Sequence, residues 1–170
     1  MIAVGKSVSR TSGPGPLTGS DIERVVIGLP LTEVDELRVT SGLFYLCGHS
    51  SLHTLYPADT LNRRIGPSLP LGQFQYYTDP LGVPVAFCNW AWLNASVLDE
   101  VLATGRDLRA DEFQCGDLPF FYEFLAPFGH CQAVVRDLRS LSIFKGRRIP
   151  SIRAKVGDSS QIPRVKYLQF

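Results

Sequence analysis

Phe120-Phe121-Tyr122-Glu123-Phe124-Leu125-Ala126-Pro127-Phe128-Gly129 is the stretch from which the fold is most directly predicted. Up to Ala126 every residue except Glu123 is apolar or aromatic, which is typical of a buried strand. The next three residues turn the chain, and a helix is expected over residues 130–141. This order places the turn at the carboxyl end of a buried strand, where ligand crevices are common in open α/β sheets.

Further helices and strands are predicted on both sides of this stretch. A helix is expected from Thr32, a suitable N-cap followed by acidic residues, to Gly48, a suitable end. The spacing of its apolar residues predicts its buried side: Val34, Leu37, Phe44 and Cys47, widened by Leu43 and Leu46. The remaining elements are expected as helices over 58–65 and 97–104, a hairpin of strands over 73–78 and 83–93, and strands over 149–156 and 164–170. This mixed order predicts an α/β (α+β) domain around one sheet.

The composition is that of an ordinary globular domain. The chain has 170 residues, of which 45% are hydrophobic and 19% charged, and a formal net charge of +1. So small a net charge disfavours a nucleic-acid-binding protein, and no apolar stretch is long enough to span a membrane. Residues 1–20 are rich in Gly, Ser, Thr and Pro, so we expect a flexible leader over 1–30 before a domain over 31–170.

The cysteines are widely spaced, at Cys47, Cys88, Cys115 and Cys131. This spacing fits neither a disulfide framework nor a metal clip. No secretion signal precedes them, so we expect reduced thiols in a cytoplasmic protein. Walker A and His-Glu-x-x-His motifs are absent from the sequence, and no metal site is expected.

Histidine is the side chain best suited to accept a proton near neutral pH. The candidates are His49, His53 and His130, and spacing alone does not rank them. Ser50 beside His53 indicates a serine–histidine pair, although the Gly-x-Ser-x-Gly motif of hydrolases is absent. Cys88 could act as a thiol nucleophile, but on a predicted interior strand it is more often a packing residue.

Glu123 is the only ionisable carboxylate in the apolar run over 118–126, and strand alternation predicts that it shares a face with Phe121 and Leu125. A charge buried there must be paired. We therefore expect Glu123 to bind an arginine, to orient a histidine, or to act as a base itself. The basic clusters Arg63-Arg64 and Lys145-Gly146-Arg147-Arg148 are interpreted as solvated surface, with docking of an acidic partner as the alternative.

Three blocks of sequence, in order, resemble the RTX toxin-activating lysine acyltransferases of the haemolysin-activating type. They are Ser50-Ser51-Leu52-His53 with Tyr56-Pro57, then Pro84-Val85-Ala86-Phe87-Cys88-Asn89-Trp90-Ala91, and Gly116-Asp117 with Ala126-Pro127-Phe128-Gly129. The first block departs from the family pattern, which has proline at the position of Ser51.

The resemblance implies a single GNAT-like domain, with a mixed, mostly antiparallel sheet flanked by helices. It implies an enzyme that moves a fatty acyl group from acyl carrier protein to internal lysines of an RTX protoxin and so activates it. Acyl carrier protein and the protoxin are then the partners, acyl-carrier protein is the donor substrate rather than a bound cofactor, and a homodimer is expected.

Carried over by position, the essential histidine of the family falls on His53, and Glu123 stands where the family has an aspartate. His53 would take the proton from the target lysine, and Glu123 would orient or support it. Supporting roles fall on Ser50 and Phe128 and on a backbone N–H near Trp90-Ala91, which would stabilise the oxyanion. Two alternatives remain: a GNAT-type N-acyltransferase that uses coenzyme A, and a non-catalytic module that binds the acyl carrier or the toxin.

Overall fold

A six-stranded sheet is found in the part of the chain that the computed structural model describes, residues 22–153 and 163–170. Neighbouring strands are antiparallel except β4 and β5, which are parallel. In spatial order, which is also chain order, the strands are β1 (Glu23–Arg24), β2 (Phe74–Thr78), β3 (Pro84–Leu93), β4 (Leu118–Leu125), β5 (Arg148–Ile152) and β6 (Val165–Gln169). The predicted class, an α+β fold with a mixed, mostly antiparallel sheet flanked by helices, is confirmed.

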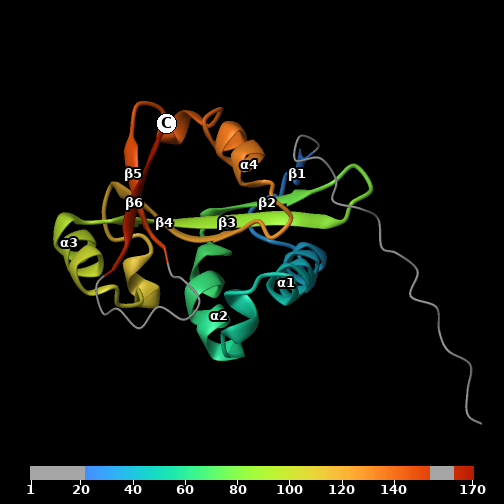
Figure 1. Ribbon diagram of the computed structural model, residues 1–170, viewed down its shortest axis with the longest axis horizontal. Helices are drawn as coiled ribbons and strands as arrows, with labels where there is room; N and C mark the ends of the chain where they lie inside the picture. The colour runs from blue at the N-terminus through green and yellow to red at the C-terminus, as the bar shows by residue number, and fades with distance from the viewer. Residues whose placement is uncertain (1–21, 154–162) are drawn as a thin grey trace, which may run out of the picture.

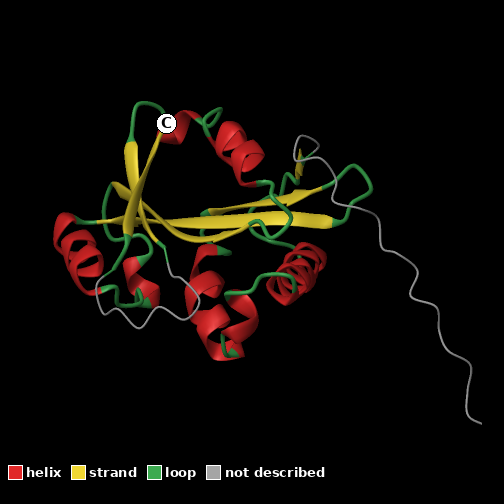
Figure 2. Cartoon of the chain, in the orientation of Figure 1, coloured by secondary structure: helices red, strands yellow, loops and turns green. Residues whose placement is uncertain are grey.

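Helices cover both faces of this sheet (Figure 1). α1 (Glu33–Gly48) and α2 (Ala58–Ile65) lie on one face, and α4 (Cys131–Leu138) lies on the other. α3 (Ala95–Thr104) connects β3 to β4 on the side of α1 and α2 (Figure 2). Each predicted helix and strand is found, with ends that differ from the prediction by a few residues. The end of the strand predicted over 149–156 lies outside the described residues.

α1 begins after Thr32, as predicted, because the Thr32 hydroxyl accepts a hydrogen bond from the Asp35 N–H at 3.1 Å. Its buried side was predicted correctly at Leu43, Leu46 and Cys47 but wrongly at the other three residues. Val34, Leu37 and Phe44 are 72%, 71% and 65% exposed. Apolar residues occur on more than one side of this helix, so sequence spacing alone left the choice open. The stripe that packs against the sheet is Val39, Leu43, Leu46 and Cys47.

The domain begins earlier than the predicted boundary at residue 31. β1 pairs with β2 through Glu23 and Thr78, and Val25 and Ile27 pack against buried residues of the core. Residues 22–27 therefore belong to the folded domain. Residues 1–21 of the predicted leader lie outside the described residues.

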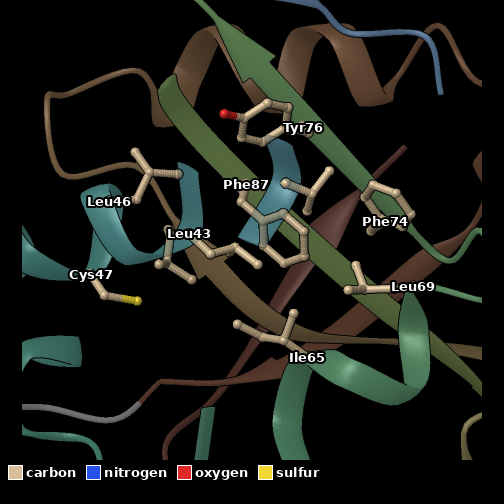
Figure 3. Close-up of a cluster of buried hydrophobic side chains, with 10 residues drawn as sticks. Leu43, Leu46, Cys47, Ile65, Leu69, Phe74, Tyr76 and Phe87 are labelled. Carbon is tan, nitrogen blue, oxygen red and sulfur yellow. The ribbon is translucent and has the colours of Figure 1, made fainter. Parts of the chain in front are cut away.

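A hydrophobic core attaches α1 and α2 to the sheet (Figure 3). Leu43 of α1 and Ile65 of α2 lie beside the ring of Phe87 on β3, and Leu46 belongs to the same cluster. The Phe87 ring stacks on Phe74 of β2 with centroids 5.9 Å apart. Burial of such side chains stabilises a fold by about 1.5–3 kcal/mol each. The core therefore holds the link between α1 and α2 at a defined place above the sheet.

Candidate active site

A crevice opens where β4 and β5 meet. The parallel strands share the register pair Phe121 and Ser151, and β5 and β6 run across the direction of β3 (Figure 1). The crevice has a volume of about 250 Å³. Its walls come from β4, β5, β6, α2, α4 and the link between α1 and α2: Leu52, His53, Tyr56, Arg64, Phe121, Tyr122, Glu123, Phe124, Cys131, Val135, Ser151, Ile152, Arg153 and Leu168.

A β-bulge in β4 directs Glu123 toward α2. Asn89 of β3 lies opposite Glu123, whereas its neighbour Trp90 lies opposite Phe121, so Tyr122 is an extra residue in β4. Bulges bend a strand and redirect side chains beside active sites. As a result, both Tyr122 and Glu123 contact one side chain of α2, Arg64.

The bulge also overturns the predicted alternation along β4. Leu125 packs in the cluster of α1 and α2, but Phe121 packs in the cluster on the α4 side of the sheet. The prediction that Glu123 shares a face with Phe121 and Leu125 is therefore wrong for Phe121. A strand without an extra residue would have kept the two-residue period.

His53 is the predicted histidine that the structure brings to Glu123. It is the first residue of a short 3-10 helix, η1 (His53–Leu55), and only 5% of its surface is exposed. Its Nδ1 lies 2.6 Å from the Ser50 Oγ, and its Nε2 lies 3.1 Å from Oε2 of Glu123. The ring of Tyr56 lies 5.2 Å from the imidazole. Both ring nitrogens are thus engaged.

The Glu123 carboxylate has a partner on each oxygen. Oε2 faces His53, and Oε1 accepts a hydrogen bond from Nε of Arg64. Burial acts to raise the pKa of Glu123, but the hydrogen bond with His53 and the charge of Arg64 outweigh it and hold that pKa below its ordinary value. Glu123 therefore stays ionised at neutral pH and is a poor proton acceptor.

The negative charge of Glu123 determines which ring nitrogen of His53 carries the hydrogen. An ionised carboxylate only accepts hydrogen bonds, so Nε2 of His53 donates to Glu123. Nδ1 of the neutral ring is then the acceptor, and the Ser50 hydroxyl donates to it. The arrangement can take up one proton at Nδ1 and stabilise the resulting imidazolium against Glu123.

Two residues of the site were missed by the sequence analysis. Arg64 was interpreted as surface together with Arg63, yet its side chain is only 18% exposed against 55% for Arg63. Asn89 is fully buried, and its Oδ1 accepts the Glu123 backbone N–H at 2.8 Å. Helical spacing carried a signal for Arg64, because it follows Leu61 by three positions on the side of α2 that packs against the core.

Trp90, Ala91 and Phe128 lie outside the set of residues that line the crevice. The Trp90 backbone N–H donates to the Gln73 carbonyl at 3.0 Å, so its predicted role as an oxyanion donor is wrong. Ala91 is fully buried opposite Phe120 in the sheet. Phe128 packs against the core clusters on both faces of the sheet. These residues support the architecture around the site rather than the reacting groups.

The other candidate nucleophile and bases lie away from this pair. Cys88 is fully buried, and burial raises the pKa of its thiol, so it behaves as a packing residue. His49 is exposed and hydrogen-bonds the Tyr45 carbonyl, and His130 is buried at the start of α4. Over residues 22–153 and 163–170, no group of three or more His, Cys, Asp or Glu side chains could hold a metal ion. None of the described helices is long and apolar enough to cross a membrane.

Comparison with known proteins identifies the family. A profile of the RTX toxin acyltransferase family matches residues 32–168. The lysine acyltransferase RtxC of Vibrio cholerae serotype O1 is 35% identical over 130 residues, 75% of this chain and 84% of that protein. The protein-lysine myristoyltransferase RtxC of Kingella kingae is 25% identical over 125 residues, 74% of this chain and 73% of that protein. The leukotoxin-activating lysine acyltransferase LktC, serotype A1, of Mannheimia haemolytica is 31% identical over 94 residues, 55% of this chain and 56% of that protein. The chain belongs to the RTX toxin acyltransferase family.

Proposed function

We propose that this enzyme transfers a fatty acyl group from acyl carrier protein to a lysine of an RTX protoxin, in the cytoplasm, and thereby activates the toxin. The observation that carries the proposal is the buried His53–Glu123 pair, which lines a crevice between two parallel strands. The names of relatives support it, because they describe lysine acyltransferases and, in Kingella kingae, a protein-lysine myristoyltransferase.

The chemistry follows from the protonation of the pair. The neutral lysine amine attacks the thioester carbonyl, a C–N bond forms, the C–S bond breaks, and the carrier thiol leaves as a thiolate that is then protonated. The proton that the amine loses is taken up at Nδ1 of His53 when the Ser50 hydroxyl, which donates to that nitrogen in the resting site, rotates so that its oxygen accepts the new N–H instead. Glu123 holds the opposite N–H and stabilises the imidazolium. No acyl group is attached to the enzyme in this sequence, and no resident cofactor takes part.

A carrier protein as donor is supported by the size and charge of the site. A crevice of about 250 Å³ accommodates a narrow arm that delivers a thioester, not a whole protein domain. Arg153 lies in the wall of this crevice, directly after β5. Its positive charge favours a strongly acidic carrier.

The test is intact-protein mass spectrometry of an RTX acceptor domain incubated with this enzyme and fatty acyl-acyl carrier protein. A parallel reaction contains the same acyl group on coenzyme A. We expect the acceptor to gain the mass of the acyl chain on lysine, and to do so faster with the carrier protein. Faster transfer from coenzyme A would overturn the carrier assignment. Binding of the acyl carrier without transfer, across several chain lengths, would show a non-catalytic module instead.

A further inference from the structure

Arg64 links the crevice to two carboxylates. Its Nε donates to Oε1 of Glu123, and its Nη1 donates to Oδ1 of Asp107. The guanidinium carbon lies 4.3 Å from the centre of the Tyr122 ring. The backbone of the residue is fixed as well, because Nδ2 of Asn89 donates to the Arg64 carbonyl at 2.9 Å. The guanidinium group is therefore held at a defined distance from the carboxylate that contacts His53.

A buried carboxylate favours the protonated form of a neighbouring histidine, whereas a histidine that accepts a proton must start in its neutral form. Glu123 alone would favour the charged form of His53, because an opposite charge in hydrogen-bond contact stabilises that form. An imidazolium ion has no free lone pair and cannot accept a proton from an amine. A positive charge on the other oxygen of the same carboxylate opposes this effect.

We propose that Arg64 is a positioning residue that holds the Glu123 carboxylate and supplies the positive charge that leaves His53 neutral and able to accept a proton. The proposal rests on the function proposed above. Arg64 acts through Glu123, since its side chain contacts Glu123, Asp107 and the rings of Tyr56 and Tyr122. It therefore sets the charge balance of the pair and takes no part in the bond changes.

Within the part of the chain that the structure describes, the charged groups around His53 are Glu123, Arg64, Asp107 and, in the opposite wall, Arg153. The other titratable groups are tyrosines and cysteines. Burial raises the pKa values of Tyr56, Tyr122 and Cys131, and it raises that of Cys47 to about 11, with a contribution from the Glu123 charge at Tyr56 and Cys47. These groups are uncharged at neutral pH. Arg153 lies across the crevice on the β5 side, and Asp107, whose side chain is 38% exposed, lies behind Arg64.

The proposal predicts opposite effects for two substitutions. Arg64→Met removes the positive charge, so the pH at which transfer is half-maximal should rise by roughly one unit. Asp107→Asn removes a competing negative charge, so the same midpoint should fall. Arg64→Lys keeps a charge without the planar fork of arginine, and should bring the midpoint back toward that of the wild type. The acceptor lysine also titrates, so each variant is expressed as a ratio to the wild-type rate at every pH.

Arg63→Met is the matched control. Arg63 is the adjacent arginine of α2, is 55% exposed, and pairs with Asp59 one helical turn away. Its removal should leave the profile unchanged, because an exposed pair is screened by solvent. If Arg64→Met and Arg63→Met move the profile equally, the effect reflects the net charge of the protein and the proposal is overturned.

A measurement without turnover separates this proposal from the proposed function. The titration of the His53 imidazole, followed by NMR in enzyme labelled at histidine, should shift upward in Arg64→Met and downward in Asp107→Asn. These shifts would support the role of Arg64 even if no acyl transfer were found, in which case only the proposed function fails. A His53 titration in Asp107→Asn that is identical to that of the wild type would overturn the role of Arg64, even if Arg64→Met failed to fold.

Discussion

Nε2 of His53 lies 3.1 Å from Oε2 of Glu123, although the two residues are 70 positions apart in the sequence. Both side chains are 6% exposed, so little solvent screens their interaction. Two structural features bring them together. The core under α1 and α2 fixes the link that carries His53, and the bulge at Tyr122 turns Glu123 toward α2.

Replacement of Glu123 tests whether its charge is needed. Glu123→Gln keeps the shape of the side chain but removes the charge that stabilises the His53 imidazolium, so kcat should fall by about 100-fold or more. Glu123→Asp keeps the charge on an arm one methylene shorter, which cannot reach both His53 and Arg64 as well, and should give an intermediate rate. Single-turnover transfer measures both. Full turnover by Glu123→Gln would remove this carboxylate from the mechanism.

Ser50→Ala tests the hydrogen bond at the other side of the imidazole. The Ser50 hydroxyl lies 2.6 Å from Nδ1 of His53 and accepts the backbone N–H of His53 at 3.4 Å. Loss of one such bond amounts to about 1 kcal/mol, so kcat should fall by roughly tenfold at most. A loss as large as that of a His53 variant would mean that Ser50 is itself a reacting group, contrary to this account. Ser51→Ala is the control, because Ser51 is exposed next to it.

The lowered pKa of Glu123 makes folding stability depend on pH. Its carboxyl binds a proton less readily in the folded chain than in the unfolded chain, where the pKa is about 4.3. The contribution of Glu123 is therefore fully present above that value and is lost as the pH falls through the lower, folded pKa. Urea unfolding at pH 7 and near pH 3 should show that the stability difference between wild type and Glu123→Gln shrinks at low pH. A difference that is constant over this range would contradict the lowered pKa.

Phe87→Ala tests the core that holds η1 in place. Phe87 is fully buried between α1, α2 and β2, so its truncation should lower the free energy of unfolding by about 3–5 kcal/mol. Phe44→Ala removes the same side chain from a position that is 65% exposed, and should change stability by about 0.5 kcal/mol or less. Equal losses in urea titrations of the two variants would show that the assignment of the buried side of α1 is incorrect.

Local signals were sufficient to predict most of the elements. Thr32 caps α1 through its hydroxyl, and Gly105 ends α3 in the left-handed conformation, with φ of 70°. Both devices act within one helical turn, so they can be recognised from neighbouring residues. The buried side of α1 could not be predicted in this way, because Val34 and Val39 are equally apolar and only contact with the sheet distinguishes them.

The candidate site, too, could be predicted from the sequence only in part. His53, Ser50 and Glu123 stand in sequence blocks that could be identified, and the burial of Glu123 required a partner for its charge. The identity of that second partner, Arg64, depends on the bulge at Tyr122, which consists of one extra residue relative to β3. Register of this kind is a property of two paired strands and leaves no trace in either strand alone.

Transfer by the His53→Ala variant is the measurement that tests the central claim most directly. An RTX acceptor domain and fatty acyl-acyl carrier protein are incubated with wild type, with His53→Ala, or with His49→Ala, which removes an exposed histidine of the same region. The account predicts that intact-protein mass spectrometry shows acylated acceptor with wild type and with His49→Ala, and little or none with His53→Ala. Acylation of the acceptor at the wild-type rate by His53→Ala would contradict it.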